Sequence, residues 1–133
     1  PAPVAGSARD GSGQPGEPLA VRVALGPDDE HVANTAALFD NVWRIGADTS
    51  RVGVRLDGDA TLAWATDREQ PSSGMAAGAI QVPRDGRPIV FLADHPTTGG
   101  YPVVGVVHPA DLAALAQRQP GAAVRFIVVT RKR

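Results

Sequence analysis

Apolar and polar residues alternate along several short stretches of this chain, and each stretch predicts a β-strand. Between residues 19 and 25, Leu19, Val21, Val23 and Leu25 fall on one face, and Arg22 falls on the other. This period of two is the side-chain spacing of a strand. Alternation and short apolar runs predict further strands over residues 41–46, 51–57, 61–66, 78–82, 89–93, 101–107 and 124–128.

Two segments have helical spacing instead. The first follows Asp28 and Asp29, which can cap the first amides, and extends to about residue 40. The second begins at Pro109, which suits the first helical position, and ends before the Pro120-Gly121 pair. The strands lie too close together for βαβ units. The pattern therefore predicts a mainly β fold, an antiparallel barrel or sandwich with two short helices.

One turn in this pattern is well defined. Asp85-Gly86 lies between the apolar runs 78–82 and 89–93, and this dipeptide is typical of β-hairpins. Pro83 and Pro88 stand at both shoulders and cannot donate a ladder hydrogen bond. The hairpin is therefore expected to end at a sheet edge or a bulge.

The first 18 residues differ in composition from the rest. They consist mostly of Pro, Gly, Ser and Ala, with few apolar side chains to bury. Such a segment predicts a flexible linker that joins the barrel domain, residues 19–133, to an upstream part. The chain starts with proline, and its one methionine is Met75. We expect a processed chain or a piece of a longer protein. Part of the binding site would then lie in the missing piece.

Composition narrows the classes of function. The 133 residues include no cysteine, so thiol chemistry and disulfides are excluded, and the net charge of −1 gives no reason to expect nucleic acid or a membrane surface as partner. No apolar run reaches the length of about 20 residues that spans a membrane. A cytoplasmic location is expected. The three histidines have no metal-ligand spacing, so no metal site is predicted, and no phosphate-binding P-loop is present.

The segment from Asp94 to Pro102 is the strongest candidate for chemistry. It contains a carboxylate at the end of an apolar strand, followed by Thr97, Thr98, Gly99, Gly100 and Tyr101. Consecutive glycine and threonine amides can form an anion-binding concavity, and Asp94 can orient an amide or act as a base. The other interpretation is a hairpin turn whose threonines bond their own backbone, and composition alone favours it.

Three further polar residues are candidates for ligand binding. Arg51 and Arg55 are four residues apart, so on a strand they share one face and can bind a carboxylate or phosphate. A solvated strand face explains them equally well. Gln81 lies in an otherwise apolar strand, where its amide can bind an amide-like ligand or form a packing hydrogen bond.

Three segments together resemble one known family. Residues 78–102, GAIQVPRDGRPIVFLADHPTTGGYP, resemble the signature of the KipA and allophanate hydrolase subunit 2 family, which includes the C subunit of 5-oxoprolinase and part of the carboxyltransferase region of urea carboxylase. Residues 49–56 and 110–126 are similar to its arginine-glycine-arginine-leucine motif and its closing segment. The resemblance covers about residues 19–129 and the C-terminal half of such a protein. This chain departs from the family pattern at Ser50, Val52, Val54, Ser73, His95 and Pro96.

The resemblance implies a cyclophilin-like barrel and a role in a complex. The expected function is ATP-dependent hydrolysis of a small cyclic amide or urea derivative, with a KipI-like (allophanate hydrolase subunit 1) partner and the N-terminal half of the same subunit. ATP would bind in a partner or in that other half. Asp94 would be catalytic, and the substrate would be bound by Gln81, Thr97, Thr98, Gly99, Gly100, Tyr101, Arg51 and Arg55. The alternatives are a non-catalytic module that binds a KipI-like kinase inhibitor, and a carboxyltransferase component like that of urea carboxylase.

Overall fold

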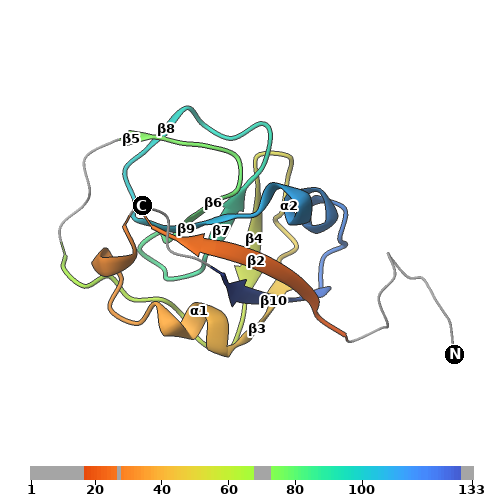
Figure 1. Cartoon of the computed structure of the whole chain (residues 1–133), viewed down its shortest axis with the longest axis horizontal. Coiled ribbons are helices and arrows are strands. Elements are labelled where there is room, and N and C mark those ends of the chain that lie inside the picture. Colours follow the sequence, from red (N-terminus) through yellow and green to blue (C-terminus); the bar gives the residue numbers. More distant parts are fainter. Residues whose placement is uncertain (1–16, 27, 68–72, 130–133) are drawn as a thin grey trace, which may run out of the picture.

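The computed structural model describes residues 17–26, 28–67 and 73–129. All but the last two residues of the expected linker, 1–18, lie outside this part. Within the described residues, seven strands close into a barrel in the order β10-β2-β9-β6-β7-β4-β3 (Figure 1). Their bounds are β2 Leu19–Leu25, β3 Val42–Ile45, β4 Gly53–Asp57, β6 Ala79–Gln81, β7 Ile89–Phe91, β9 Val103–Val107 and β10 Ala123–Val128.

The interior of the barrel is filled by the side chains that alternate inward. Val21 and Val23 of β2 are fully buried, and Trp43 and Phe126 are the largest buried side chains. The Trp43 indole Nε1 donates to the Leu38 carbonyl oxygen at 2.9 Å, so its polar atom is satisfied. The predicted fold class, a mainly β cyclophilin-like barrel with short helices, is confirmed.

One ladder of the barrel runs parallel rather than antiparallel. β10 pairs with β2 in parallel, with Val124 opposite Leu19 and Val128 opposite Val23, whereas the other ladders are antiparallel. Parallel neighbours need a long connection, and here almost the whole barrel connects them. Alternation assigns side chains to faces but not directions to strands, so the sequence pattern did not indicate this junction.

The first predicted helix is divided in two. A 3-10 turn, η1, covers Asp29–His31, and α1 covers Ala36–Asp40. Between them Asn34 donates to the Thr61 carbonyl oxygen and accepts from the Ala63 amide. The prediction of one continuous helix is wrong because this stretch of backbone is fixed to a distant segment.

That distant segment, residues 61–66, does not form the predicted strand. It makes an isolated bridge between Trp64 and Val32, it is bonded to the Asn34 side chain, and Leu62 donates its amide to the Gly86 carbonyl oxygen. The predicted hairpin is confirmed: β6 pairs with β7, and Gly86 turns the chain with φ of +79°. The expected irregularity is a register shift between Ile80 and Gln81, where β6 meets β9.

A second, smaller layer lies outside the barrel. β5 Ser73–Gly74 and β8 Thr98–Gly99 form a two-stranded sheet. Met75, next to β5, packs on an outer apolar cluster of the strands β6, β7 and β9, namely Ala79, Ile89, Phe91 and Val103. The β5–β8 layer therefore covers this face of the barrel, well away from α2 in Figure 1.

The second predicted helix is confirmed as α2, Pro109–Ala116, with proline in its first turn. His108 caps it, because the Nδ1 atom accepts from the Ala110 amide at 3.1 Å. Asp111 fastens the helix to β2: it accepts from the Arg22 backbone amide, Nε and Nη2 at 2.8, 2.9 and 3.0 Å. Hydrogen bonds from the Arg22 side chain hold the pKa of the Asp111 carboxyl below its usual range.

Candidate functional site

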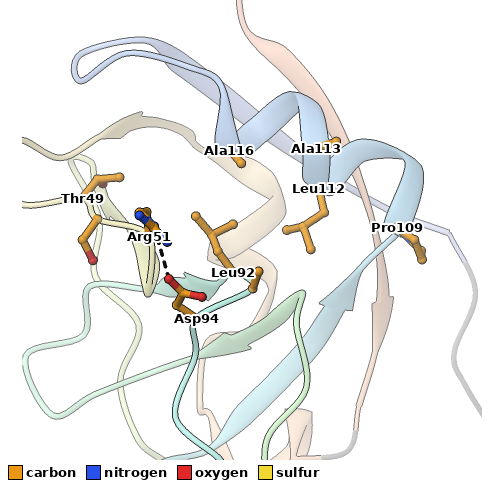
Figure 2. A pocket seen from close by; sticks show the side chains of 10 residues that line it. Thr49, Arg51, Leu92, Asp94, Pro109, Leu112, Ala113 and Ala116 are labelled. Atoms are coloured by element: carbon orange, nitrogen blue, oxygen red, sulfur yellow. Dashed lines mark ion pairs between the residues drawn. The ribbon is translucent and has the colours of Figure 1, made fainter.

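A cavity of about 650 Å³ lies between α2 and the loops that flank β4 and β7 (Figure 2). Its walls come from three segments: the residues before β4, the turn after β7, and one face of α2. The lining residues are Thr49, Ser50, Arg51, Leu92, Ala93, Asp94, Pro109, Leu112, Ala113 and Ala116. The cavity combines an apolar wall with a small set of polar groups, as ligand sites do.

An ion pair stands at the polar side of this cavity. Arg51 Nε lies 3.2 Å from Asp94 Oδ2, and the two side chains are 91% and 52% exposed (Figure 2). The backbone brings them together, because the pairing of β4 with β7 continues beyond the strands: Leu92 donates its amide to Val52, and Asp94 donates its amide to Arg51. A cation and a carboxylate beside an apolar wall can bind the charged end of a small ligand and orient its amide.

Arg55 has a different environment. It lies within β4, where its Nε is 3.2 Å from Asp48 Oδ2, and it does not line the cavity. The two arginines that the sequence places on one face thus have separate carboxylate partners. Of the two, Arg51 lines the cavity.

The threonine and glycine residues after Asp94 lead away from the cavity. Thr98 and Gly99 form β8, paired with β5, and the Thr97 carbonyl oxygen accepts from the Met75 amide. The positive-φ glycines of the described residues are Gly26, Gly78, Gly86 and Gly121. Gly99 and Gly100 are therefore not in the left-handed conformation that the expected anion-binding concavity needs, and Thr98 and Gly99 are extended in β8.

Tyr101 completes the loop at an aromatic contact. Its ring centroid lies 5.6 Å from that of Trp64, and the Arg84 guanidinium lies 4.4 Å from the Trp64 ring centroid. The Trp64 Nε1 atom donates to the Val82 carbonyl oxygen at 2.9 Å. The Tyr101 side chain thus packs on the loop before β5 rather than on the cavity.

Gln81 is buried on the outer face of β6, under the β5–β8 layer. It is 6% exposed, and a Cβ atom placed on Gly99 would lie 2.7 Å from its Nε2 atom. Within residues 17–26, 28–67 and 73–129, the side-chain amide has no hydrogen-bond partner. The structure therefore places Gln81 and Gly99 together, and it places Arg51 and Asp94 together elsewhere.

Sequence reasoning missed several residues of these two places. The apolar wall from α2, Leu112, Ala113 and Ala116, has only the signal of an amphipathic helix, which does not show what the helix faces. Met75 lies beside Gly99 through its Sδ and Cγ atoms, and the sequence contained no signal for this contact. Both omissions arise because the contacts join segments that lie far apart in the chain.

A metal-binding cluster and a membrane-spanning helix are both absent from the described part of the chain. It holds no group of three or more histidine, aspartate or glutamate residues that could bind a metal ion. It also holds no helix with the length and apolar character needed to cross a membrane.

Residues 4–128 match a known family model, that of the carboxyltransferase domain, subdomain A and B. The chain belongs to this carboxyltransferase domain family. The match extends over the whole barrel, from β2 to β10, and it includes both the cavity and the β5–β8 layer.

Relatives of this carboxyltransferase domain chain include the C subunits of two bacterial 5-oxoprolinases. The one from Escherichia coli is 37% identical over 80% of the chain, and the one from Haemophilus influenzae is 40% identical over 68%. The chain spans 35% and 29% of the length of these two proteins. A urea amidolyase from Lachancea kluyveri is 26% identical over 78% of the chain and 6% of its own length.

Solved structures agree with the fold. The crystal structure of TTHA0988 has a TM-score of 0.69 and 34% identity, and it covers 84% of this chain and 21% of its own. The urea amidolyase of K. lactis has a TM-score of 0.76 over 84% of this chain and 7% of its own. At 23% identity, this second likeness shows the barrel alone.

Proposed function

We propose that this chain is part of a subunit that works in an ATP-dependent complex and hydrolyses a carbon–nitrogen bond of a small cyclic amide or urea derivative. The observation that supports it most is the Arg51–Asp94 pair at the edge of a 650 Å³ cavity, in a family whose members include the C subunit of 5-oxoprolinase. A cavity of this size fits a small ligand. The substrate class is taken from the names of the relatives.

The two charged residues have distinct roles in this proposal. Arg51 binds the carboxylate of the substrate, or the phosphate of an activated form, through its guanidinium. Asp94 accepts a hydrogen bond from the amide N–H of the substrate, or it acts as the base when the ring opens. An ion pair as exposed as this one adds only about 0–1 kcal/mol to stability, so stability alone gives little reason for its position.

The other parts of the complex would supply the nucleotide site. The sequence contains no P-loop, so we propose that ATP binds in a KipI-like partner or in the remaining part of the subunit. The N-terminal half of the same subunit would close the open side of the cavity. Such a complex would work in the cytoplasm.

The test is glutamate formation from 5-oxoproline by the reconstituted complex with ATP. We expect Asp94→Asn to lower kcat by about 10²-fold or more, which is the usual contribution of a positioned base. Asp57→Asn is the matched control, because Asp57 is also half-exposed and paired with an arginine, Arg87, but lies outside the cavity lining. Equal turnover in the two variants would remove Asp94 from the mechanism.

The family description supports a second candidate, a carboxyltransferase component that acts on urea. This function and the first share a small amide-like substrate but differ in the co-substrate. If the complex turns over urea only in the presence of a biotinylated carrier, the second candidate is correct. If ATP and 5-oxoproline are sufficient without the carrier, the first is correct.

A further inference from the structure

Burial of the Gln81 side-chain amide lowers the stability of the fold, because no hydrogen bond within the described residues compensates for it. Gln81 is the buried polar residue among them, at 6% exposure, and its amide has no hydrogen-bond partner there. A buried amide left without a hydrogen bond lowers stability by about 1–3 kcal/mol. Native structures keep such groups where a ligand or a functional role compensates for them.

The surroundings of this amide resemble a small binding site. The outer cluster of Ala79, Ile89, Phe91 and Val103, together with Met75, provides an apolar environment on the same face. Gly99 lies directly over the amide, and a Cβ at that position would come within 2.7 Å of Nε2 and 3.0 Å of the Met75 Sδ atom. The backbone of Gly99 therefore covers the amide closely, and a side chain at this position would not fit. Hydrogen bonds made in such an apolar place are strong.

The layer above the amide is lightly held. β5 and β8 pair through two residue pairs, Ser73 with Gly99 and Gly74 with Thr98, and one further backbone bond joins Met75 to Thr97. A two-stranded sheet of this length is marginally stable by itself. Because the layer covers the amide, a ligand would reach Gln81 where this short sheet lifts from the face of β6.

From these observations we propose that Gln81 is a recognition residue for the cis-amide edge of a lactam or urea, that is, an N–H and a C=O on the same side of a planar group. This inference rests on the substrate class of the proposed function and assigns to it a second contact, apart from the Arg51–Asp94 pair of the cavity. A primary amide offers one donor and one acceptor side by side, so it forms two hydrogen bonds with that edge. A carboxylate offers acceptors alone and would face the Gln81 Oε1 atom, so a neutral amide fits better.

The proposal also accounts for the two places found in the structure. Residues 94–99 run from the cavity to the β5–β8 layer: Asp94 at one end pairs with Arg51, and Gly99 at the other end lies over Gln81. A charged group of a ligand suits the Arg51–Asp94 pair, and a neutral amide edge suits Gln81. Recognition of the amide by Gln81 is thus a separate step from binding of charge by Arg51.

The experiment compares two matched probes on the complete subunit, 2-pyrrolidinone and N-methyl-2-pyrrolidinone. They differ in the N–H that the Gln81 carbonyl oxygen would accept. In a titration followed by NMR, we expect the wild type to bind 2-pyrrolidinone about tenfold more tightly or better, because one buried hydrogen bond of this kind is worth that factor. In Gln81→Met the preference should vanish. Equal binding of the two probes by the wild type, or a preference that survives in Gln81→Met, would overturn the proposal.

A second pair of variants tests the place without changing the amide. Gly99→Ala puts a methyl group against Gln81 Nε2 and should weaken 2-pyrrolidinone binding at least fivefold. Gly74→Ala, in the neighbouring strand of the same layer, meets nothing within 4 Å and should leave binding unchanged. Equal binding by the two variants would contradict the proposed position of the ligand.

Failure of this inference and failure of the proposed function give different results. A probe preference that depends on Gln81, in a complex that does not convert 5-oxoproline, supports the recognition site and rejects the proposed activity. Conversion of 5-oxoproline with unchanged KM and kcat in Gln81→Met supports the activity and rejects the recognition site.

Discussion

Replacement of Gln81 by methionine should make the protein more stable. The two side chains have similar length and volume, and the cross-strand neighbours Ile89 and Val103 are apolar, so methionine fits the same space. The change removes an unpartnered buried amide that costs about 1–3 kcal/mol. We expect Gln81→Met to raise the free energy of unfolding by about 1–2 kcal/mol. For a chain of about 150–250 residues or more, as the complete subunit is expected to be, this corresponds to a rise in Tm of a few degrees.

The assay is thermal unfolding of the complete subunit, followed by circular dichroism, with guanidinium chloride as a second method. Urea is unsuitable as the denaturant because it presents the amide edge that Gln81 is proposed to bind. Gln119→Met is the control, since Gln119 is exposed after α2 and its replacement should change stability by less than about 0.5 kcal/mol.

The opposite sign would refute the reasoning. If Gln81 makes a structural hydrogen bond, Gln81→Met leaves its partner buried and unsatisfied, and the protein should lose about 1–3 kcal/mol. A loss of about 1 kcal/mol or more in Gln81→Met, with Gln119→Met unchanged, would show that the amide is part of the packing. Increased stability together with lost probe discrimination is the combination expected of a residue retained for function.

Two further predictions concern the scaffold of the site. Gly86→Ala should destabilise the protein by about 3 kcal/mol, because the new Cβ would lie 2.6 Å from the Leu62 carbonyl oxygen and the residue has a positive φ. Gly121→Ala is also at positive φ but lies in open space, so it should cost about 1 kcal/mol. Chemical unfolding measures both losses of stability, and equal losses would contradict the steric argument. Asp111→Asn should lower Tm at pH 7. The lowered pKa of Asp111 in the folded state gives stability above its unfolded pKa of about 4, and this stability is lost as pH falls through the folded pKa. The difference in Tm between wild type and Asp111→Asn should therefore shrink below about pH 4, and a constant difference at all pH values would exclude the ionised carboxylate as its source.

The parts of the fold that the sequence predicted are those set by local pattern. Alternation in β2 identified Val21 and Val23 as inward residues because a strand side chain has only two faces to choose from. Pro109 and Gly86 fixed a helix start and a turn through their own backbone preferences. The broken first helix could not be predicted, because Asn34 finds its partners in a segment more than twenty residues away.

The candidate site was predictable by residue type and not by arrangement. Asp94 and Gln81 stand out in the sequence because a carboxylate after an apolar strand and an amide within one are unusual, and the binding roles given to them and to Arg51 stay predictions. Their grouping depends on which strands pair: β4 next to β7 brings Arg51 to Asp94, while β8 lies over β6 and brings Gly99 to Gln81. Arg55 lies within β4, after Arg51, and its carboxylate partner is Asp48.

The segment from residue 94 to 101 was expected to form one wall of a single pocket, and its course in the structure changes that expectation. The carboxylate at its start faces the cavity beside α2, and the glycine in its middle lies over a buried amide on another face of the barrel. A ligand that used both ends would have to span the segment itself. The simpler arrangement has two smaller contacts, one for charge and one for a neutral amide, linked by the short strand that pairs with β5.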